Sequence, residues 1–343
     1  MTPPARPPLP ESDSTGQDWP PSASLDAIRA RAALLARLRG YFAAAGVLEV
    51  ETPIASRAAV ADPALASLAT RWHGPGAGDG LALYLHTSPE FPMKRLLAAG
   101  IGPIYQICKV FRDGERGRLH HPEFTLLEWY RPGWDYRRLM DEVADLARLG
   151  LDRPDFPAQR IAYRDLFRDR LGLDPWTAAL GELRACALAQ GIDGAETLDL
   201  ERDGWLDLLL THRLESGLGR GCLTFLTDYP PSQAALARVR APTAAGEVAV
   251  ALRFELYLDG VELANGFQEL TDPAAQHARF VADLEQRRHR GLPPPPLDDA
   301  FLGALQAGMP EGAGVALGLD RLLMAALGLR HIDQVLAFPV ERA

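Results

Sequence analysis

The sequence predicts an α+β fold in which helices flank an antiparallel sheet. Apolar residues recur at helical spacing over residues 25–42 and 136–149, whereas residues 105–112 and 122–130 have the alternation typical of strands. Two further strand-like runs meet at Asp259-Gly260, a dipeptide that favours the tight turn of a hairpin. Hairpins build antiparallel sheets and amphipathic helices need a sheet to cover, so we expect one layered structure.

Composition is typical of a globular protein. The chain has 343 residues, of which 47% are hydrophobic, and a formal net charge of -9, which disfavours a general attraction to nucleic acid. No apolar run approaches the roughly 18 residues of a membrane helix, and the Pro-rich start lacks the features of a secretion signal, so we expect a cytoplasmic protein without a membrane partner. Cys108, Cys186 and Cys222 lack C-x-x-C spacing, which argues against a disulfide framework or a thiolate zinc site.

The order of elements along the chain is also predicted. Residues 1–24 are rich in Pro, Ser, Asp and Gly without apolar periodicity, which is typical of a disordered tail. The helix that begins at Leu25 is expected to end at Gly46, before the short strand of "VLEVETP". "LPPPP" at 292–296 indicates a loop, and "GVALGLDRLLMAALG" a Gly-rich strand that turns into a helix.

The strands 105–112 and 122–130 carry the first functional pattern. Alternation places Phe124, Leu126, Glu128 and Tyr130 on one face of the second strand. A basic loop joins the strands, and arginine on phosphate with a ring on the base would suit a nucleoside triphosphate. The alternative is a solvated hairpin with surface cations. The basic residues of this hairpin are Arg112, Arg116, Arg118, His120 and His121.

A second pattern lies at the start of the C-terminal helix. Asp320 is expected to cap this helix, which places Arg321 in its first turn, where a cation is disfavoured by the helix dipole. A phosphate bound at the same terminus would offset that cost. The alternative is an ordinary arginine that points to water.

A third pattern supplies acid. Glu262 and Glu269 are seven residues apart and would face opposite sides of a straight strand, but a bulge or turn at Asn265-Gly266 could bring both to one cavity. Two carboxylates facing a triphosphate indicate magnesium. The alternative is a pair of surface carboxylates on an edge hairpin.

Together these segments resemble the class II aminoacyl-tRNA synthetases. "GVLEVETP", "FRDGERGRLHHPEFTLLEWY" and "GVALGLDR" are similar to motifs 1, 2 and 3 of that class, in the right order. "TSPE", "MKRLL" and "VELANGFQELTD" narrow the resemblance to the lysyl type, and within it to the family of elongation factor P beta-lysine ligases. "MKRLL" contains Lys94, which with Lys109 makes up all the lysine of the chain.

The resemblance implies a class II catalytic core over residues 25–343 and a set of site residues. Arg112 and Arg321 would be catalytic, and Glu262 and Glu269 would bind Mg²⁺. The amino acid, (R)-beta-lysine, would contact Ser88, Pro89, Glu90, Tyr130, Glu269 and Ala316. ATP would contact Arg112, Asp113, Gly114, Glu115, His121, Phe124, Glu262, Leu263, Gly318 and Arg321.

The resemblance further implies that the amino acid is activated by ATP and transferred to a lysine of elongation factor P. Motif 1 begins at Gly46, which leaves no room for an anticodon-binding domain, so we expect no tRNA partner, and motif 1 implies a homodimer. The alternatives are a lysine-activating enzyme that acts on tRNA or another acceptor, and an inactive regulatory paralogue. The sequence departs from the family at Asp113, Gly114 and His121, which leaves Glu115 to take over an adenine contact.

Overall fold

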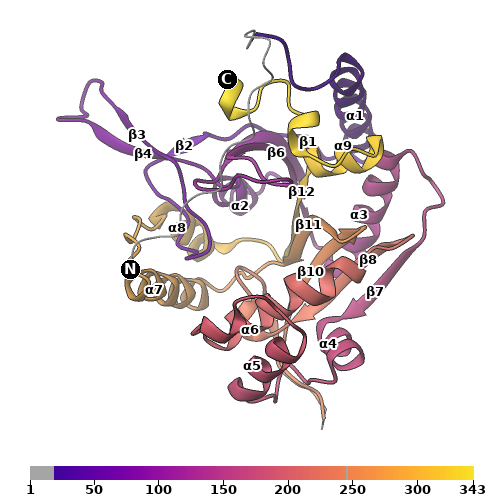
Figure 1. The fold of residues 1–343 in the computed structure, drawn as a ribbon. Helices are drawn as coiled ribbons and strands as arrows, with labels where there is room; N and C mark the ends of the chain where they lie inside the picture. Colours follow the sequence, from indigo (N-terminus) through magenta and orange to yellow (C-terminus); the bar gives the residue numbers. More distant parts are fainter. Residues whose placement is uncertain (1–18, 245) are drawn as a thin grey trace.

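The computed structural model describes residues 19–244 and 246–343, and its centre is a nine-stranded sheet (Figure 1). Neighbouring strands are antiparallel except at two pairs, β1 with β5 and β7 with β8. The fold class predicted from the sequence is therefore confirmed. The strand order is β1 (Leu48–Glu49), β5 (Ile104–Phe111), β6 (Glu123–Pro132), β12 (Gly312–Gly318), β11 (Val261–Gln268), β10 (Val250–Leu258), β8 (Leu223–Tyr229) and β7 (Ala158–Ala162), while β9 (Val239–Arg240) pairs with β10.

Three helices cover one face of this sheet: α1 (Leu25–Ala44), α3 (Tyr136–Leu151) and α9 (Leu319–Leu327) (Figure 1). The Ser24 hydroxyl caps α1 by accepting a hydrogen bond from the backbone N–H of Ala27 at 3.1 Å. Leu38 and Phe42 of α1 pack with Trp129 of β6 in one fully buried cluster. Because this face is filled with apolar side chains, the opposite face of the central strands is the one available for a site.

The opposite face is bordered by two groups of helices (Figure 1). Phe91, Phe280 and Phe301 pack together between α2 (Glu90–Ala98), α7 (Pro273–His289) and α8 (Asp299–Gly308). A second cluster joins β8 and β10 to α4 (Tyr163–Leu171), α5 (Leu180–Ala189) and α6 (Arg202–Leu209). A small sheet of β2 (Ala55–Ser56), β4 (Leu81–Leu85) and β3 (Ala69–Trp72) extends from the body. None of the helices within the described ranges has the length and apolar character needed to cross a bilayer.

The predicted hairpins are confirmed within a residue or two. Residues 105–112 and 122–130 form β5 and β6, which pair from Ile104 with Tyr130 to Phe111 with Glu123. Between β10 and β11, Asp259 and Gly260 have φ values of 50° and 76°, the left-handed geometry of a tight two-residue turn. Turn chemistry therefore determined the register of this pair.

The N-terminal tail ends earlier than predicted. Residues 1–18 of the predicted disordered segment lie outside the described residues. Ser22 and Ala23 donate backbone hydrogen bonds to the carbonyls of Ala337 and Leu336, at 2.8 and 3.1 Å. Ala23 is also buried. The prediction of disorder through residue 24 is wrong for these last residues because the partner segment lies more than 300 residues away in the chain.

Candidate active site

The open face of the sheet forms the floor of a cleft. Alternate residues of β6, Phe124, Leu126, Glu128 and Tyr130, line it, as predicted, whereas the intervening Trp129 is buried in the core. Two cavities lie along this floor: the Arg321 cavity, of about 320 Å³, and the Tyr130 cavity, of about 250 Å³. They form one continuous cleft because they share the lining residues Asp62, Leu65, Arg112, Leu126, Arg253, Asn265 and Ala316.

Small residues of β12 provide the depth of the cleft. A Cβ atom at Gly314 would overlap the ring of Tyr130 and the carboxylate of Glu269, so only glycine fits there. Ala316 is paired with Glu128 of β6 on one side and with Asn265 of β11 on the other. Since paired residues share a face, the Ala316 methyl group lies on the floor where the two cavities meet.

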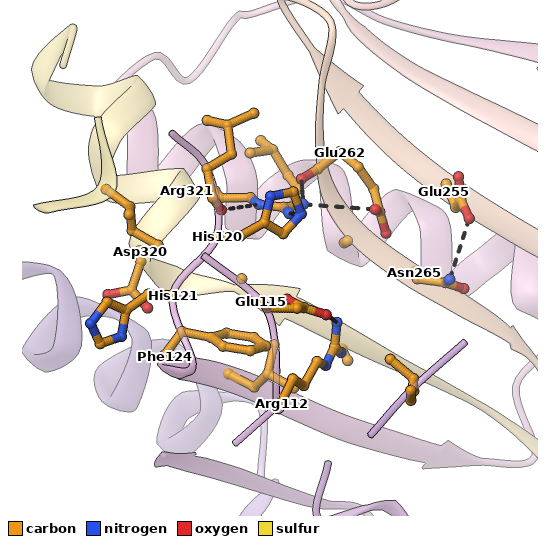
Figure 2. A pocket seen from close by; sticks show the side chains of 18 of the residues that line it. Arg112, Glu115, His120, His121, Phe124, Glu255, Glu262, Asn265, Asp320 and Arg321 are labelled. Carbon is orange, nitrogen blue, oxygen red and sulfur yellow. Dashed lines mark hydrogen bonds and ion pairs between the residues drawn. The ribbon is translucent and has the colours of Figure 1, made fainter. Parts of the chain in front are cut away.

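Arg321 is held at the start of α9 by backbone carbonyls (Figure 2). Its Nη1 donates to the carbonyl of Glu262 at 2.8 Å, and its Nε donates to the carbonyl of Leu119 at 3.3 Å. Nη2 lies 3.0 Å from Nε2 of His120. Burial, followed by the charge of Arg321, lowers the pKa of His120, which keeps this imidazole a neutral acceptor. The first-turn cation is thus fixed in place, with its plane beside the cavity.

Asp320 does not cap α9, contrary to the prediction. Gly318 is the N-cap residue, and the buried Asp320 carboxylate accepts a hydrogen bond from the backbone N–H of Thr125 at 2.6 Å. It also forms an ion pair with Arg31 of α1. Asp320 therefore ties α9 to β6 and α1, a role that only the packing of three distant segments could reveal.

Arg112 lies at the junction of the cavities. Its guanidinium carbon is 4.9 Å from the centroid of the Phe124 ring, and its Nη1 is 3.6 Å from the Glu115 carboxylate (Figure 2). Its buried Nε has no hydrogen-bond partner among the described residues. An arginine with an unused, desolvated donor is suited to bind an anion such as a phosphate.

The remaining motif 2 positions take different places. Asp113 and Gly114 lie outside the linings of both cavities, and Gly114, with φ of 79°, makes the turn that leads to Glu115. His121 lines the Arg321 cavity, but its Nδ1 donates to the carbonyl of Glu123 at 2.5 Å and its Nε2 accepts from the N–H of Val340 at 2.8 Å. Because both ring nitrogens are used, His121 has no free polar atom for a ligand.

A bulge in β11 does place Glu262 on the cleft face, but not where it was predicted. The pairing with β10 shifts between Leu256 with Ala264 and Tyr257 with Glu262, so Leu263 is the extra residue, and the pairing continues without a break through Asn265 and Gly266. This one-residue shift brings Glu262 to the same face as Asn265. The sequence reasoning therefore gave the right kind of distortion at the wrong residues.

The sequence reasoning missed Glu255, which is paired with Asn265 and lines the Arg321 cavity together with Glu262 (Figure 2). Glu255 accepts hydrogen bonds from Arg253 and Tyr257, both at 2.6 Å. Burial, with the charge of Glu255, raises the pKa of Glu262 to about 7. The available signal was the hairpin itself: a turn at 259–260 places residues equally far before and after it side by side.

Glu262 and Glu269 are not brought together as the predicted metal pair. The Glu262 carboxylate lies 3.7 Å from Arg321, whereas the Glu269 carboxylate forms an ion pair with Lys94 at 2.5 Å, beside the Tyr130 cavity. No group of three or more His, Cys, Asp or Glu side chains in the described ranges could hold a metal ion. The donors that fit a hard cation are Glu255 and Glu262, whose mutual repulsion a cation would relieve, with the other ligands coming from phosphate oxygens.

The other end of the cleft is acidic. The Lys94 ammonium lies 2.5 Å from both Glu90 and Glu269, and the lysine side chain is 1% exposed. Burial alone would lower the pKa of Lys94, but the charges of Glu269 and Glu90 outweigh it and raise this pKa to about 12. Lys94 is therefore a permanent internal cation, the role of one of the two lysines that the sequence reasoning noted without assigning it a function.

Glu128 is the third carboxylate of this end. It accepts hydrogen bonds from the hydroxyls of Ser88 and Tyr130, both at 2.6 Å. Burial and the nearby charge of Glu90 raise the pKa of Glu128 to about 7, and burial raises that of Glu269 to about 8 although Lys94 opposes the rise. When all three carboxylates are ionised, one lysine leaves two negative charges for a ligand. Pro89, outside both linings, is the N-cap residue of α2.

Comparison with known proteins agrees with this arrangement. The family described as tRNA synthetases class II (D, K and N) matches residues 21–342. Proteins of Salmonella arizonae, Salmonella dublin and Salmonella gallinarum, each named elongation factor P--(R)-beta-lysine ligase, are 48% identical to this chain over 325 residues, which is 95% of this chain and 98% of each relative. The chain therefore belongs to the class II tRNA synthetase family.

Proposed function

We propose that this protein is an ATP-dependent ligase that activates (R)-beta-lysine as an adenylate and transfers it to a lysine side chain of elongation factor P. The observation that carries this proposal is the continuity of the cleft at Arg112, which lines both a cavity bordered by arginines and an acidic cavity. An adenylate-forming enzyme needs one such junction, where the phosphate of ATP meets the carboxylate of an amino acid. The names of the 48% identical relatives support this substrate and acceptor.

ATP would occupy the Arg321 cavity. Phe124 and Arg321 would flank the adenine ring, with Leu263, Gly318 and Glu115 lining the same space. The unused Nε of Arg112 would bind the α-phosphate. In this proposal Asp113, Gly114 and His121 shape the loop around ATP rather than contact it with polar side-chain atoms.

Glu255 and Glu262 would hold Mg²⁺ together with phosphate oxygens. Both carboxylates line the Arg321 cavity from neighbouring strands of one hairpin, which fits an ion that prefers oxygen ligands. When bound, Mg²⁺ would supply charge neutralisation for the triphosphate. Glu269, which our sequence analysis also assigned to the metal, would bind only the amino acid in this scheme.

The amino acid would lie in the Tyr130 cavity with its ammonium groups toward Glu90, Glu128 and Glu269. Its carboxylate oxygen would attack the α-phosphorus of ATP, pyrophosphate would leave, and Arg112 and Arg321 would stabilise the developing charge. The neutral amine of the acceptor lysine would then attack the carbonyl carbon of the adenylate. An amide bond forms, AMP leaves with the electron pair of the broken C–O bond, and the amine gives up its proton. No enzyme nucleophile is needed.

We further propose a homodimer, although one argument for it has become weaker. The apolar face of α1 is already covered within the protomer, because Leu34, Leu38 and Phe42 are buried in its own core. What supports association is an exposed apolar set around the short edge strand β1, with Leu48, Ile54 and Ile101 exposed by 52%, 44% and 38%. Light scattering at micromolar concentration should give twice the mass of one chain, and a monomer mass would refute the proposal.

The test of the proposed function is a mass measurement on purified elongation factor P. With ATP, Mg²⁺ and (R)-beta-lysine, the wild-type protein should add one lysyl residue to the factor, and omission of any one component should abolish the gain. Transfer of the same amino acid to tRNA instead, with the factor unmodified, would favour the alternative acceptor. Absence of pyrophosphate exchange with both α-lysine and beta-lysine would indicate an inactive paralogue.

A further inference from the structure

A glutamine that neither the sequence reasoning nor the chemistry above uses lies in the wall of the Tyr130 cavity. Gln276 belongs to the first turns of α7 and shares one helical face with Phe280 and Asp283, which line the same cavity. Gln276 is only 1% exposed. Neither its Oε1 nor its Nε2 has a hydrogen-bond partner among the residues that the structure describes.

A second buried glutamine shows how unusual this is. Gln268, at the end of β11, is 8% exposed, and both of its amide atoms are bonded. Its Oε1 accepts from the N–H of Tyr136 at 3.0 Å, and its Nε2 donates to the carbonyl of Gly312 at 2.8 Å. Buried amides are normally satisfied in this way, because an unmet buried polar group destabilises the fold. Gln276 thus carries a cost in the free protein that a ligand in the cavity would remove.

The chemistry of the cavity indicates which ligand group does so. Glu90 and Glu128 line the same cavity as Gln276, and the Glu269 carboxylate lies beside it against Gly314. A diamino acid brings two ammonium groups, each with three N–H donors, and carboxylates paired with Lys94, Ser88 and Tyr130 have part of their acceptor capacity already in use. A neutral amide oxygen adds an acceptor without adding another charge to the site.

We propose that Gln276 is a specificity residue of the amino-acid site, whose side-chain oxygen accepts a hydrogen bond from an ammonium group of the bound diamino acid. The inference rests on the proposed function, since it requires that a diamino acid occupies the Tyr130 cavity. It adds α7 to the elements that recognise the substrate, opposite the strands of the sheet floor.

The test compares Gln276→Met with Gln268→Met, two substitutions of the same kind at buried sites. Pyrophosphate exchange should show the KM for (R)-beta-lysine raised about ten- to a hundredfold in Gln276→Met, with the KM for ATP within about twofold of wild type. The melting temperature of the ligand-free variant should rise by about 1 to 4 °C, because the unmet amide is gone. Gln268→Met should instead lower the melting temperature, because it breaks two existing hydrogen bonds.

Gln276→Glu serves as the rescue variant, since it keeps an acceptor oxygen in the same place. Its KM for the amino acid should lie closer to wild type than that of Gln276→Met, whereas a KM above that of the Met variant would overturn the assignment of the oxygen as an acceptor. An unchanged KM in Gln276→Met, or a melting temperature that falls as it does in Gln268→Met, would overturn the inference. Failure of the wild-type protein to exchange with any diamino acid would instead overturn the proposed function itself.

Discussion

The two ends of the cleft use opposite solutions to the problem of buried charge. The Arg321 cavity has three arginines, Arg112, Arg253 and Arg321, around the carboxylates of Glu255 and Glu262. The Tyr130 end places a single lysine, Lys94, among three carboxylates. The first end is therefore rich in cations and suited to phosphate, whereas the second keeps an excess of negative charge for a ligand with two ammonium groups.

The difference teaches why arginine and lysine are not interchangeable here. Of the 36 basic residues only Lys94 and Lys109 are lysines, so arginine is the default cation of this chain. Planar guanidinium groups can bind phosphate with several donors, and they border the nucleotide end. At the amino-acid end, the compact ammonium of Lys94 fits within 2.5 Å of both Glu90 and Glu269 and holds them apart.

The largest expected effect comes from removal of the cation that both ends share. Arg112→Ala should lower the rate of pyrophosphate exchange about 10²- to 10³-fold, because the developing charge on the α-phosphate loses its buried donor. The matched control is Arg118→Ala, on the same loop but exposed, with its Nη1 bonded only to the carbonyl of Arg330 at 3.3 Å. The control should stay within about twofold of wild type, and equal losses in both variants would refute the assignment of Arg112.

A smaller effect, confined to one end, should follow from Glu269→Gln. Loss of a charge-assisted hydrogen bond of about 1.5 to 3 kcal/mol should raise the KM for the amino acid about ten- to a hundredfold while ATP affinity changes much less. Glu262→Gln should show the opposite split, with a higher requirement for ATP and Mg²⁺. If Glu269→Gln weakened ATP and amino-acid use equally, the separation of the two ends would be wrong.

The junction between the ends should control the choice between isomers. Ala316 lies beside Glu128 and Asn265, and a change of one methyl group in a pocket discriminates by about 1 to 3 kcal/mol. We expect Ala316→Gly to raise adenylation of α-lysine relative to beta-lysine by about tenfold, with ATP binding nearly intact. Pyrophosphate exchange with both isomers measures this, and an unchanged ratio would place selectivity elsewhere in the cavity.

The smallest effect is a pH dependence limited to the acidic end. The pKa of Glu128 is raised to about 7 and that of Glu269 to about 8, so both are protonated in part below those values, while Lys94, with a pKa of about 12, stays charged. An ammonium ligand requires the ionised carboxylates, so the KM for the amino acid should fall by a few-fold as pH rises from about 6 to 8. Glu128→Gln should flatten this profile. A KM that rises over the same range would contradict the sign.

Much of the site followed from local patterns. The alternation of Phe124, Leu126, Glu128 and Tyr130 along β6 could be read from the sequence because a strand has a period of two. The tight turn at Asp259-Gly260 was equally local. Both predictions depended on backbone geometry that a few neighbouring residues determine, and for this reason they were accurate.

The errors share the opposite cause. Glu255 was missed, and Glu269 was joined to a metal pair, because the position of the bulge at Leu263 depends on how β11 pairs with β10. Asp320 was expected to cap its own helix, yet its partners are Thr125 and Arg31, which come from remote segments. In each case the competing interaction was long-range, and a local pattern carries no information on it.

By itself, the sequence determined the antiparallel sheet, its hairpins and the resemblance of its motifs to the class II synthetases, since apolar periodicity and turn residues act over short stretches of chain. The tertiary structure alone decided which charges meet: Lys94 with Glu269, Glu255 with Glu262, and the unpaired amide of Gln276 in the cavity wall. The physical reason is that the energy of a buried polar group depends on desolvation and on partners that only the folded chain brings within hydrogen-bond distance.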